Sequence, residues 1–484
     1  MRLVLLIYLI GSLAILEATH NQRWEMLHRE PPIQGKSMKN VRTVETKWIR
    51  QKVDNFDPQN PSTWSMRYME NADYYESGGP LFVYVGGEWT INAGSISWGH
   101  FHDMAKDLGA YLFYTEHRFY GLSRPTASTR TDLLKFLNID QALADLAHFV
   151  EEMRNTIPGA SNAKVIMAGG SYAGTMVAWF RQKYPHLIDG AWASSAPLLA
   201  KLDFVEYKEV VTESIRLVGG DDCANRIDRA YDQMEDLLNQ GEFDRVREEF
   251  KVCDNIDFSY RYDTSNFLST ISDYLAGTVQ YHRTGDIEGV CEIINDESIT
   301  DDMTALANWF TRYVYDCVDL SYYETIYYYR NTSWDHGANR GAMRPWLYQT
   351  CAEYGWYQTS GSENQIFGSG FPVEFYLRMC SDLYNYVFTR TLLESNVART
   401  NVIYGHMAPA VTNVFFTHGQ LDPWRPMGLQ EDLNEHSPAV VIPLASHCED
   451  LSSISDADSP EMLAAKERIF ELIQLWLSNG PNVP

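Results

Sequence analysis

One serine in this chain stands where a serine hydroxyl can act as a nucleophile. Ser171 follows the apolar run Lys164–Ala168 and two glycines, and it precedes a helical pattern over Thr175–Tyr184. A sharp turn between a buried strand and a helix lifts the hydroxyl clear of the top of a sheet. Strand and helix cross closely there, so small residues such as Gly169 and Ala173 are needed. The pattern predicts nucleophilic catalysis; the alternative is an ordinary turn that contains a serine.

A base and an acid for this serine are also present. A serine hydroxyl becomes a nucleophile when a base takes its proton, and that base is usually a histidine held by a carboxylate. On a strand–turn–helix of this kind, the acid follows the serine in the chain and the histidine follows the acid. Asp422 comes just past the apolar strand Val411–Thr417, and His447 just past Val440–Leu444. We therefore predict that Ser171, Asp422 and His447 form a catalytic triad.

Three other residues compete for these roles. His418 precedes Asp422 and so breaks the chain order, and His436 lies in a polar turn before its strand. Asp450 comes three residues after His447 and is expected to cap the next segment. The alternative for His447 itself is a histidine in a surface loop.

The negative oxygen that develops during attack on a carbonyl needs backbone N–H donors. One donor is expected from Tyr172, the residue after the nucleophile, and the other from the loop Gly86–Glu88 after an early strand. Within that loop we predict that the N–H of Gly87 is the second donor, and Glu88 is the other candidate. The alternative is a plain glycine turn.

The pattern of strands and helices divides the chain. Residues 79–200 alternate apolar strands with helical stretches, which implies a mostly parallel sheet with helices on both faces. From about residue 202 the chain becomes helical and then rich in Tyr and Trp, and strands return at 411–417. We predict an α/β fold, namely an α/β-hydrolase core with a large inserted helical cap. The predicted units are a signal peptide (1–18), the first part of the core (19–201), the cap (202–395) and the second part of the core (396–484).

Composition and the N-terminus restrict the class of protein. The 484 residues carry a formal charge of −25, which argues against nucleic acid as a partner. Arg2, the apolar stretch Leu3–Leu16 and a small residue at Ala18 are typical of a secretory signal. That stretch is shorter than the roughly 20 residues of a membrane span, and a signal anchor is the alternative. We expect a secreted or lysosomal protein with no membrane partner, no cofactor and no metal.

The cysteines and one sequon agree with secretion. Seven cysteines are present, so at least one lacks an intramolecular partner. The first six, Cys223 to Cys380, lie in one region and are expected to form three disulfides, with 15 pairings open. Cys448 stands apart from them. Asn331 begins the sequon Asn-Thr-Ser and is a predicted glycosylation site.

These motifs together resemble the family of prolylcarboxypeptidase, dipeptidyl peptidase II and thymus-specific serine protease. The matching segments follow the family's order and are Gln51–Phe56, Glu116–Gly121 with Ser123 and Pro125, Gly169–Tyr172, Ala193–Pro197, Trp346–Glu353, Gly419–Trp424 and Ser446–Cys448. The resemblance is greatest to the thymus-specific branch, and it places the triad on the same three residues. The chain departs from the family at Ala173 (usually Gly), Asn55 (usually His) and Trp89 (often Gly). Trp89 flanks the oxyanion loop, where its ring would narrow the pocket.

The resemblance implies a serine exopeptidase that cleaves next to proline through an acyl-enzyme, with the cap over the site. It implies a substrate pocket that includes Glu88, Trp346, Tyr348 and Trp424, and Trp356 and Tyr357 are further aromatic candidates for stacking on a proline ring. Aromatic core packing is the alternative for each ring. The other functions considered are an esterase or other acyl hydrolase of the same fold, and a non-catalytic binding protein.

Several properties are left open by the sequence. It does not distinguish a carboxypeptidase from a dipeptidyl peptidase, and a homodimer is neither required nor excluded. A free histidine titrates near 6.5, so an enzyme working in lysosomes would need a histidine with a lowered pKa. On that argument kcat/KM falls on acidification with an apparent pKa below 6.

Overall fold

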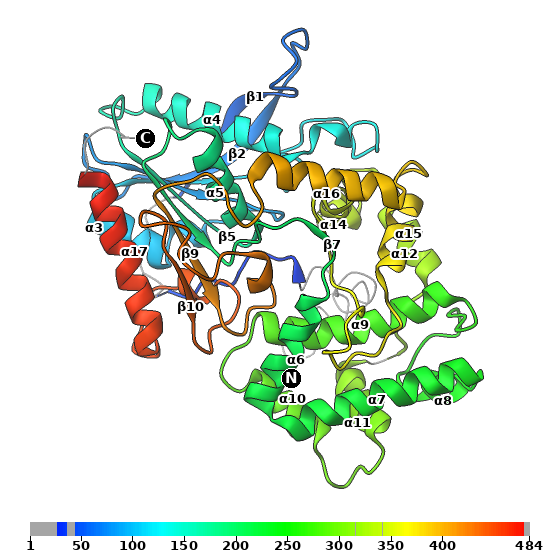
Figure 1. The fold of residues 1–484 in the computed structure, drawn as a ribbon. Coiled ribbons are helices and arrows are strands. Elements are labelled where there is room, and N and C mark those ends of the chain that lie inside the picture. The colour runs from blue at the N-terminus through cyan, green and yellow to red at the C-terminus, as the bar shows by residue number, and fades with distance from the viewer. Residues whose placement is uncertain (1–26, 36–43, 315, 341, 479–484) are drawn as a thin grey trace, which may run out of the picture.

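The computed structural model describes residues 27–35, 44–314, 316–340 and 342–478. Figure 1 shows a sheet flanked by helices and, at one end of it, a large helical region. The predicted signal peptide lies outside the described residues.

An eight-stranded sheet forms the centre of the molecule, in the order β1-β2-β4-β3-β5-β6-β9-β10. The β1–β2 and β2–β4 pairs are antiparallel and all the others are parallel. The strands are β1 (Glu45–Lys52), β2 (Thr63–Asn71), β3 (Leu81–Val85), β4 (Tyr111–Thr115), β5 (Val165–Gly170), β6 (Gly190–Ser194), β9 (Val414–Gly419) and β10 (Ala439–Ile442).

Helices cover both faces of this sheet, which explains why its central strands are continuous apolar runs. Alternate residues of a strand point to opposite faces. Val83 and Met167 accordingly pack in the cluster with α4 (Ile139–Thr156) and α5 (Tyr172–Lys183). Phe82 and Ile166 pack in the other cluster with α3 (His100–Asp107) and α17 (Pro460–Ser478). The sheet and its helices have the α/β-hydrolase fold, as predicted.

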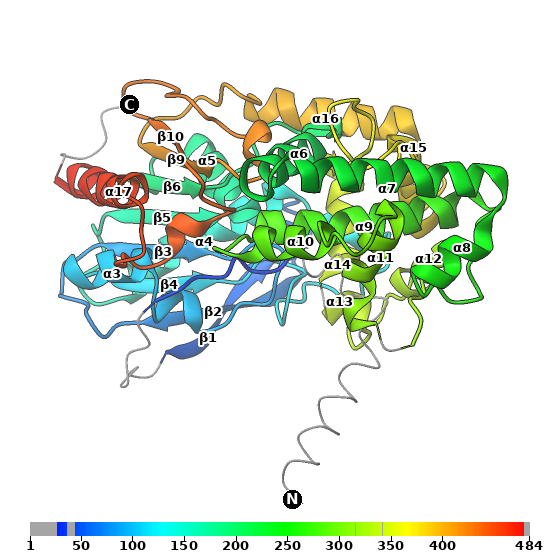
Figure 2. The same ribbon diagram turned by 90° about the horizontal axis from the view of Figure 1, so that it is seen from below.

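Between β6 and β9 the chain builds the helical cap (residues 204–404), which both views place at one end of the sheet (Figures 1 and 2). A small parallel pair, β7 (Lys201–Asp203) and β8 (Gly355–Tyr357), joins its start to its middle. The cap helices are α6 (Glu206–Gly219), α7 (Asp221–Gln240), α8 (Phe243–Glu249), α9 (Arg261–Gln280), α10 (Asp286–Ile294), α11 (Asp302–Phe310), α12 (Tyr322–Tyr329), α13 (Gly337–Arg340), α14 (Met343–Gln349), α15 (Val373–Leu383) and α16 (Arg390–Tyr404).

Shorter helical turns complete the chain. They are η1 (Gly94–Ile96), η2 (Leu134–Phe136), η3 (Thr311–Tyr313), η4 (Thr350–Tyr354), η5 (Arg425–Met427) and η6 (Glu449–Leu451). The sequence boundary of the cap at residue 395 falls inside α16. This helix continues to Tyr404 because its next stop signal is Gly405, which takes the left-handed conformation at φ 82°.

Three disulfides lie within the cap, as the cysteine count predicted. They join Cys223 to Cys291, Cys253 to Cys317 and Cys351 to Cys380. Cys448 is free and buried. The disulfides fit an oxidising compartment.

Candidate active site

Ser171 lies in the turn between β5 and α5. Its backbone has φ 59° and ψ −133°, a strained combination for a residue with a side chain. The Ser171 N–H donates to the carbonyl of Ser194 on the neighbouring strand at 2.9 Å, which helps to hold this turn. The serine is therefore fixed at the end of β5, where the sequence predicted it.

Small residues allow the strand and helix to cross there. A Cβ atom on Gly169 would lie 2.5 Å from the Ala173 carbonyl, and one on Gly174 would lie 2.8 Å from the Ser194 oxygen. Ala173 is fully buried, so its methyl group is accommodated where the resembling family usually has glycine.

His447 and Asp422 form a buried pair beyond the ends of β10 and β9. His447 Nδ1 lies 2.8 Å from Asp422 Oδ1, and because a carboxylate only accepts, Nδ1 carries the hydrogen. The same Oδ1 accepts the backbone N–H of Trp424 at 2.9 Å. Among the described residues His447 Nε2 has no hydrogen-bond partner, so in the neutral ring this nitrogen can accept a proton.

Burial and charge oppose each other in this pair. Burial would lower the pKa of His447, but the Asp422 carboxylate outweighs it and raises this pKa well above 6.5. Burial would likewise raise the pKa of Asp422, but the charge of His447 and hydrogen bonds hold it well below 3.8. The contact thus favours the protonated form of His447 and the ionised form of Asp422.

The two loops approach each other through a glycine. A Cβ atom on Gly419 would lie 2.2 Å from the carbonyl oxygen of Ala445. Leu421 N–H donates to that same oxygen at 2.9 Å. This contact positions the Asp422 turn against the His447 loop.

The His447 loop also contacts the serine turn. A Cβ atom on Gly170 would lie 2.9 Å from Cys448 Sγ, so the residue before Ser171 touches the residue after His447. Cys448 N–H donates to Ser195 Oγ at 2.9 Å. The segments that carry the predicted triad residues therefore converge at one edge of the sheet.

The three competing residues occupy other positions. His418 is buried behind Asp422, with Nδ1 3.9 Å from Oδ2, and its ring packs against Gly428. His436 is an exposed histidine beside Glu435. Asp450 is buried inside η6 and does not cap it, because the N-cap residue is Cys448; its carboxylate instead accepts the hydroxyls of Ser194, at 2.6 Å, and Thr417.

The proposed oxyanion donors lie on the two expected segments. Tyr172 is the first residue of α5, where the N–H groups have no acceptor within the helix. Gly87 follows β3 under the ring of Trp89, and a Cβ atom there would lie 2.6 Å from that ring. Trp89 Nε1 donates to the Tyr114 hydroxyl at 2.7 Å. The Trp89 ring therefore leaves no room for a side chain at position 87.

Glu88 is a buried acid beside this loop, with 4% of its surface exposed. Burial raises the pKa of its carboxyl group to about 8. Its Oε1 lies 3.9 Å from His28 Nδ1, and its Oε2 has no partner among the residues described. The carboxyl group is therefore mostly protonated at neutral pH.

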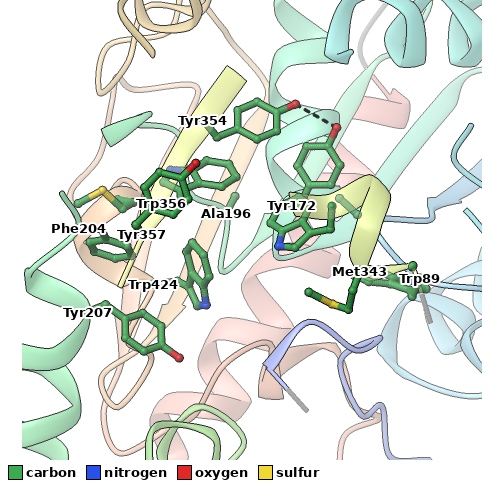
Figure 3. Close-up of a cluster of buried hydrophobic side chains, with 14 of the residues drawn as sticks. Trp89, Tyr172, Ala196, Phe204, Tyr207, Met343, Tyr354, Trp356, Tyr357 and Trp424 are labelled. Carbon is green, nitrogen blue, oxygen red and sulfur yellow. Dashed lines mark hydrogen bonds between the residues drawn. The ribbon is translucent and has the colours of Figure 1, made fainter. Parts of the chain in front are cut away.

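An aromatic cavity of about 50 Å³ lies between the cap and the core. Its wall includes Trp346, Trp356, Tyr357 and Trp424, and Figure 3 shows the last three of these in one cluster of buried side chains. Tyr348 lines a different cavity with Glu353 and packs on Tyr384 and Phe388. The structure thus groups the predicted pocket aromatics except Tyr348, whose side chain leaves α14 on another face.

The Tyr172 hydroxyl connects the serine turn to the cap. It receives hydrogen bonds from Gln349 Nε2 at 2.9 Å and from the Tyr354 hydroxyl at 3.1 Å (Figure 3). It also lies 3.2 Å from His117 Nε2. Because His117 Nδ1 contacts the Arg118 carbonyl at 2.7 Å, Nε2 is the acceptor and Tyr172 donates to it.

The segment Glu116–Gly121 has a structural role that the sequence did not reveal. The Glu116 carboxylate accepts from Arg67 and from the N–H of Leu122. A Cβ atom on Gly121 would collide with that carboxylate at 2.0 Å. Arg118 forms two hydrogen bonds with Asp145, at 2.7 and 2.8 Å. These buried pairs fix the loop after β4 under the site.

Sequence reasoning missed three residues of the site. Gln280, at the end of α9, accepts the His447 N–H on its carbonyl at 2.9 Å, and its side-chain oxygen accepts from Trp424 Nε1 at 3.1 Å. Tyr281 packs edge-on against the His447 ring at 5.9 Å, and His28 reaches the aromatic cavity. None of these residues follows a strand of the sheet, so no strand-end pattern marks them.

Within the described part of the chain, no group of three or more His, Cys, Asp or Glu side chains is arranged to hold a metal ion. In the same residues, no helix has the length and apolar character needed to cross a bilayer.

The fold and the polar groups at its edge define a hydrolase of the α/β class. The sequence profile of the serine carboxypeptidase S28 family matches residues 51–469. The chain belongs to this family, as its motifs predicted, and it is a serine-type peptidase.

Individual relatives match along nearly the whole chain. The thymus-specific serine protease of Mus musculus is 32% identical over 451 residues, which cover 89% of this chain and 87% of that protein. The human thymus-specific serine protease is 30% identical, with coverage of 89% and 86%. The lysosomal Pro-X carboxypeptidase of Bos taurus is 29% identical, with coverage of 90% and 88%.

Proposed function

We propose that this protein is a serine exopeptidase that hydrolyses peptide bonds next to proline through an acyl-enzyme. Ser171 is the nucleophile, His447 the general base and Asp422 the group that orients the base. The observation that carries the proposal is the buried His447–Asp422 hydrogen bond of 2.8 Å, with an unbonded Nε2, beside the strained turn of Ser171.

The reaction follows from this arrangement. Ser171 Oγ forms a bond to the scissile carbonyl carbon while its proton passes to His447 Nε2. The N–H groups of Tyr172 and Gly87 stabilise the oxyanion. The C–N bond then breaks and the amine leaves with the proton from Nε2. Water next attacks the acyl carbon while its proton passes to the same nitrogen, the bond to Ser171 Oγ breaks, and this oxygen takes the proton back. Loss of one oxyanion donor typically costs roughly 2.7–4 kcal/mol of transition-state stabilisation.

The preference for proline rests on the aromatic cavity. Trp346, Trp356 and Trp424 line it, and flat apolar rings fit the ring of proline. One relative is named a Pro-X carboxypeptidase, which supports the same preference here. The cap over the end of the sheet favours cleavage near a chain end, because it restricts entry of a long polypeptide.

Two experiments test this function. A fluorophosphonate probe should label the wild type and not the Ser171→Ala variant; an unlabelled wild type would exclude an enzyme and favour a binding protein. Two heptapeptides that differ only by proline or alanine before the scissile bond should differ in kcat/KM. Equal rates, or cleavage of acyl esters alone, would favour an esterase or another acyl hydrolase.

We also propose secretion or delivery to lysosomes after removal of residues 1–18. The cap disulfides and the lysosomal relative support this location. Asn331 is exposed just after the end of α12, where a glycan has room. N-terminal sequencing of the secreted protein, and its mass before and after glycosidase treatment, check both proposals.

A further inference from the structure

The N-terminal strap (residues 27–35) runs between the sheet and the cap helices, where Figure 2 shows it as a dark-blue segment. Its first residues reach the candidate active site. Leu27 is 3% exposed, and the His28 side chain is 13% exposed. The beginning of the strap is therefore buried in the wall of the aromatic cavity that we propose for the substrate.

The backbone of the strap is held as a bound peptide would be. Its Leu27 carbonyl accepts hydrogen bonds from Gln280 Nε2 at 2.8 Å and from the Tyr281 hydroxyl at 3.3 Å. The Tyr281 hydroxyl also lies 3.3 Å from the Arg29 carbonyl. Both donor residues contact His447, Gln280 through its backbone carbonyl and Tyr281 through its ring.

His28 occupies the approach to the aromatic cavity. Its ring lies 5.4 Å from the ring of Trp346 and 6.4 Å from that of Trp424, and its Nδ1 is 3.9 Å from the Glu88 carboxyl group. Leu27 and His28 themselves form part of the cavity wall.

The remaining cavity is too small for the proposed substrate. Its volume is about 50 Å³, which is room for a few water molecules. Sites for small organic ligands usually measure about 300–1,000 Å³. The cavity must therefore enlarge before a proline residue can enter, and Leu27 and His28 are the wall residues supplied by the strap.

The rest of the strap is fastened to the core. The Glu30 carboxylate accepts from the Tyr114 hydroxyl at 2.7 Å and also from Asn92 and Ser95. Ser453 N–H donates to the Gln34 carbonyl at 2.8 Å. The strap is thus anchored from its middle to its end, and its first residues project from that anchor into the cleft.

We propose that the strap is an intramolecular occupant of the peptide-binding cleft, so that the folded chain is latent until Leu27 and His28 leave it. This inference rests on the proposed peptidase function. The occupant is a segment of this chain. The ligand that it excludes is a peptide whose backbone carbonyls would accept the hydrogen bonds that Gln280 and Tyr281 donate to the strap.

Two altered chains test the proposal. One lacks residues 19–35, so that the predicted signal peptide joins Lys36 directly. The other is the full chain with Leu27→Ser and His28→Ser, which keeps the anchor. The matched control carries Leu475→Ser and His436→Ser, where both side chains are exposed. Each protein is assayed for hydrolysis of a proline-containing heptapeptide and for labelling by a small fluorophosphonate.

Both altered chains should gain about tenfold or more in kcat/KM for the peptide, because the fraction of open molecules limits binding. The control should match the wild type. A synthetic peptide with the strap sequence, added to the shortened chain, should then inhibit competitively. If both altered chains label normally but hydrolyse the peptide no faster than the wild type, the strap is only structural and the proposal is overturned.

Failure of the function itself would look different. No form, including the wild type, would then be labelled. In that case, fluorescence polarisation would measure the binding of a dye-labelled strap peptide to the shortened chain. Binding there, weakened in the full chain, would support the occupied cleft, and an absence of binding would overturn it.

Discussion

In the proposed mechanism, the charge state of His447 sets the pH at which this site can work. Its pKa is raised above 6.5 by Asp422 despite burial, so the protonated form of the imidazole persists to higher pH than in a free histidine. A protonated imidazole cannot accept the proton of Ser171. We expect kcat/KM to rise with pH through an apparent pKa above 6.5, measured from initial rates on a proline-containing peptide between pH 4 and 9.

This expectation reverses the one drawn from sequence. From the sequence we expected an apparent pKa below 6, because an enzyme that works in lysosomes would need a neutral histidine at acidic pH. The Asp422 contact, which raises the pKa of His447, is not visible in a sequence. An acid limb below pH 6, or a flat profile, would mean that the pair is not the base in the free enzyme.

The residue Asp422 can be tested by removing its charge alone. Asp422→Asn keeps the shape but leaves no carboxylate to hold the Nδ1–H tautomer, and we expect kcat/KM to fall about 10⁴-fold. The remaining activity should have its acid limb at lower pH, because the charge that raised the pKa of His447 is gone.

The matched control is Glu435→Gln, which removes the charge of an exposed carboxylate 3.0 Å from His436 and should leave activity unchanged. Asp422 would be excluded as the orienting acid if kcat/KM of Asp422→Asn fell less than tenfold and the acid limb of its pH–rate profile did not move.

Between elements, close approach of the β9 and β10 loops depends on Gly419. A methyl group there would lie 2.2 Å from the Ala445 oxygen, so one loop must move. We expect Gly419→Ala to lower the free energy of unfolding by about 1–3 kcal/mol and kcat/KM by more than tenfold, since Asp422 and His447 separate. Thermal unfolding and peptide hydrolysis measure the two effects.

Gly289→Ala is the control for this change. Gly289 lies inside α10, and a Cβ atom added there would have no atom within 4 Å. Alanine should therefore leave activity intact and stabilise by up to about 1 kcal/mol. If Gly419→Ala behaves like Gly289→Ala, the loop contact does not position the pair.

At the same scale, the sequence predicts the position of a residue best where that residue follows a strand of the sheet. Ser171, Asp422 and His447 all follow strands of a parallel sheet, so periodicity and chain order were enough to place them at one edge. Tyr348 and the cap boundary were not predictable in this way. The direction of a side chain on α14 and the length of α16 depend on packing among cap helices, which leaves no simple period in the sequence.

For the same reason, the positions of Gln280 and His28 could not be predicted from the sequence. Gln280 ends a cap helix and His28 belongs to an irregular segment far from it in sequence, yet hydrogen bonds and ring contacts bring both to the site. Their roles come from tertiary contacts between distant parts of the chain. A single sequence carries no local signal for such contacts.

Over the whole molecule, covalent links are distributed unevenly. All three disulfides lie in the helical cap, with sequence separations of 68, 64 and 29 residues. The sheet core depends instead on apolar packing and on buried pairs such as Arg118 with Asp145. The two parts meet at the site through noncovalent contacts, including the hydrogen bond from His447 N–H to the Gln280 carbonyl.

This distribution predicts that loss of a disulfide loosens the cap before it loosens the sheet. Closing loops of this length stabilises a fold by about 3–4.5 kcal/mol per disulfide, so Cys253→Ser with Cys317→Ser should weaken the cap far more than the sheet. We expect peptide hydrolysis to fall and hydrogen exchange to rise in α9 and neighbouring cap helices, while exchange in β5 and fluorophosphonate labelling of Ser171 change little. Equal loosening of cap and sheet would show instead that the two parts unfold as one cooperative unit.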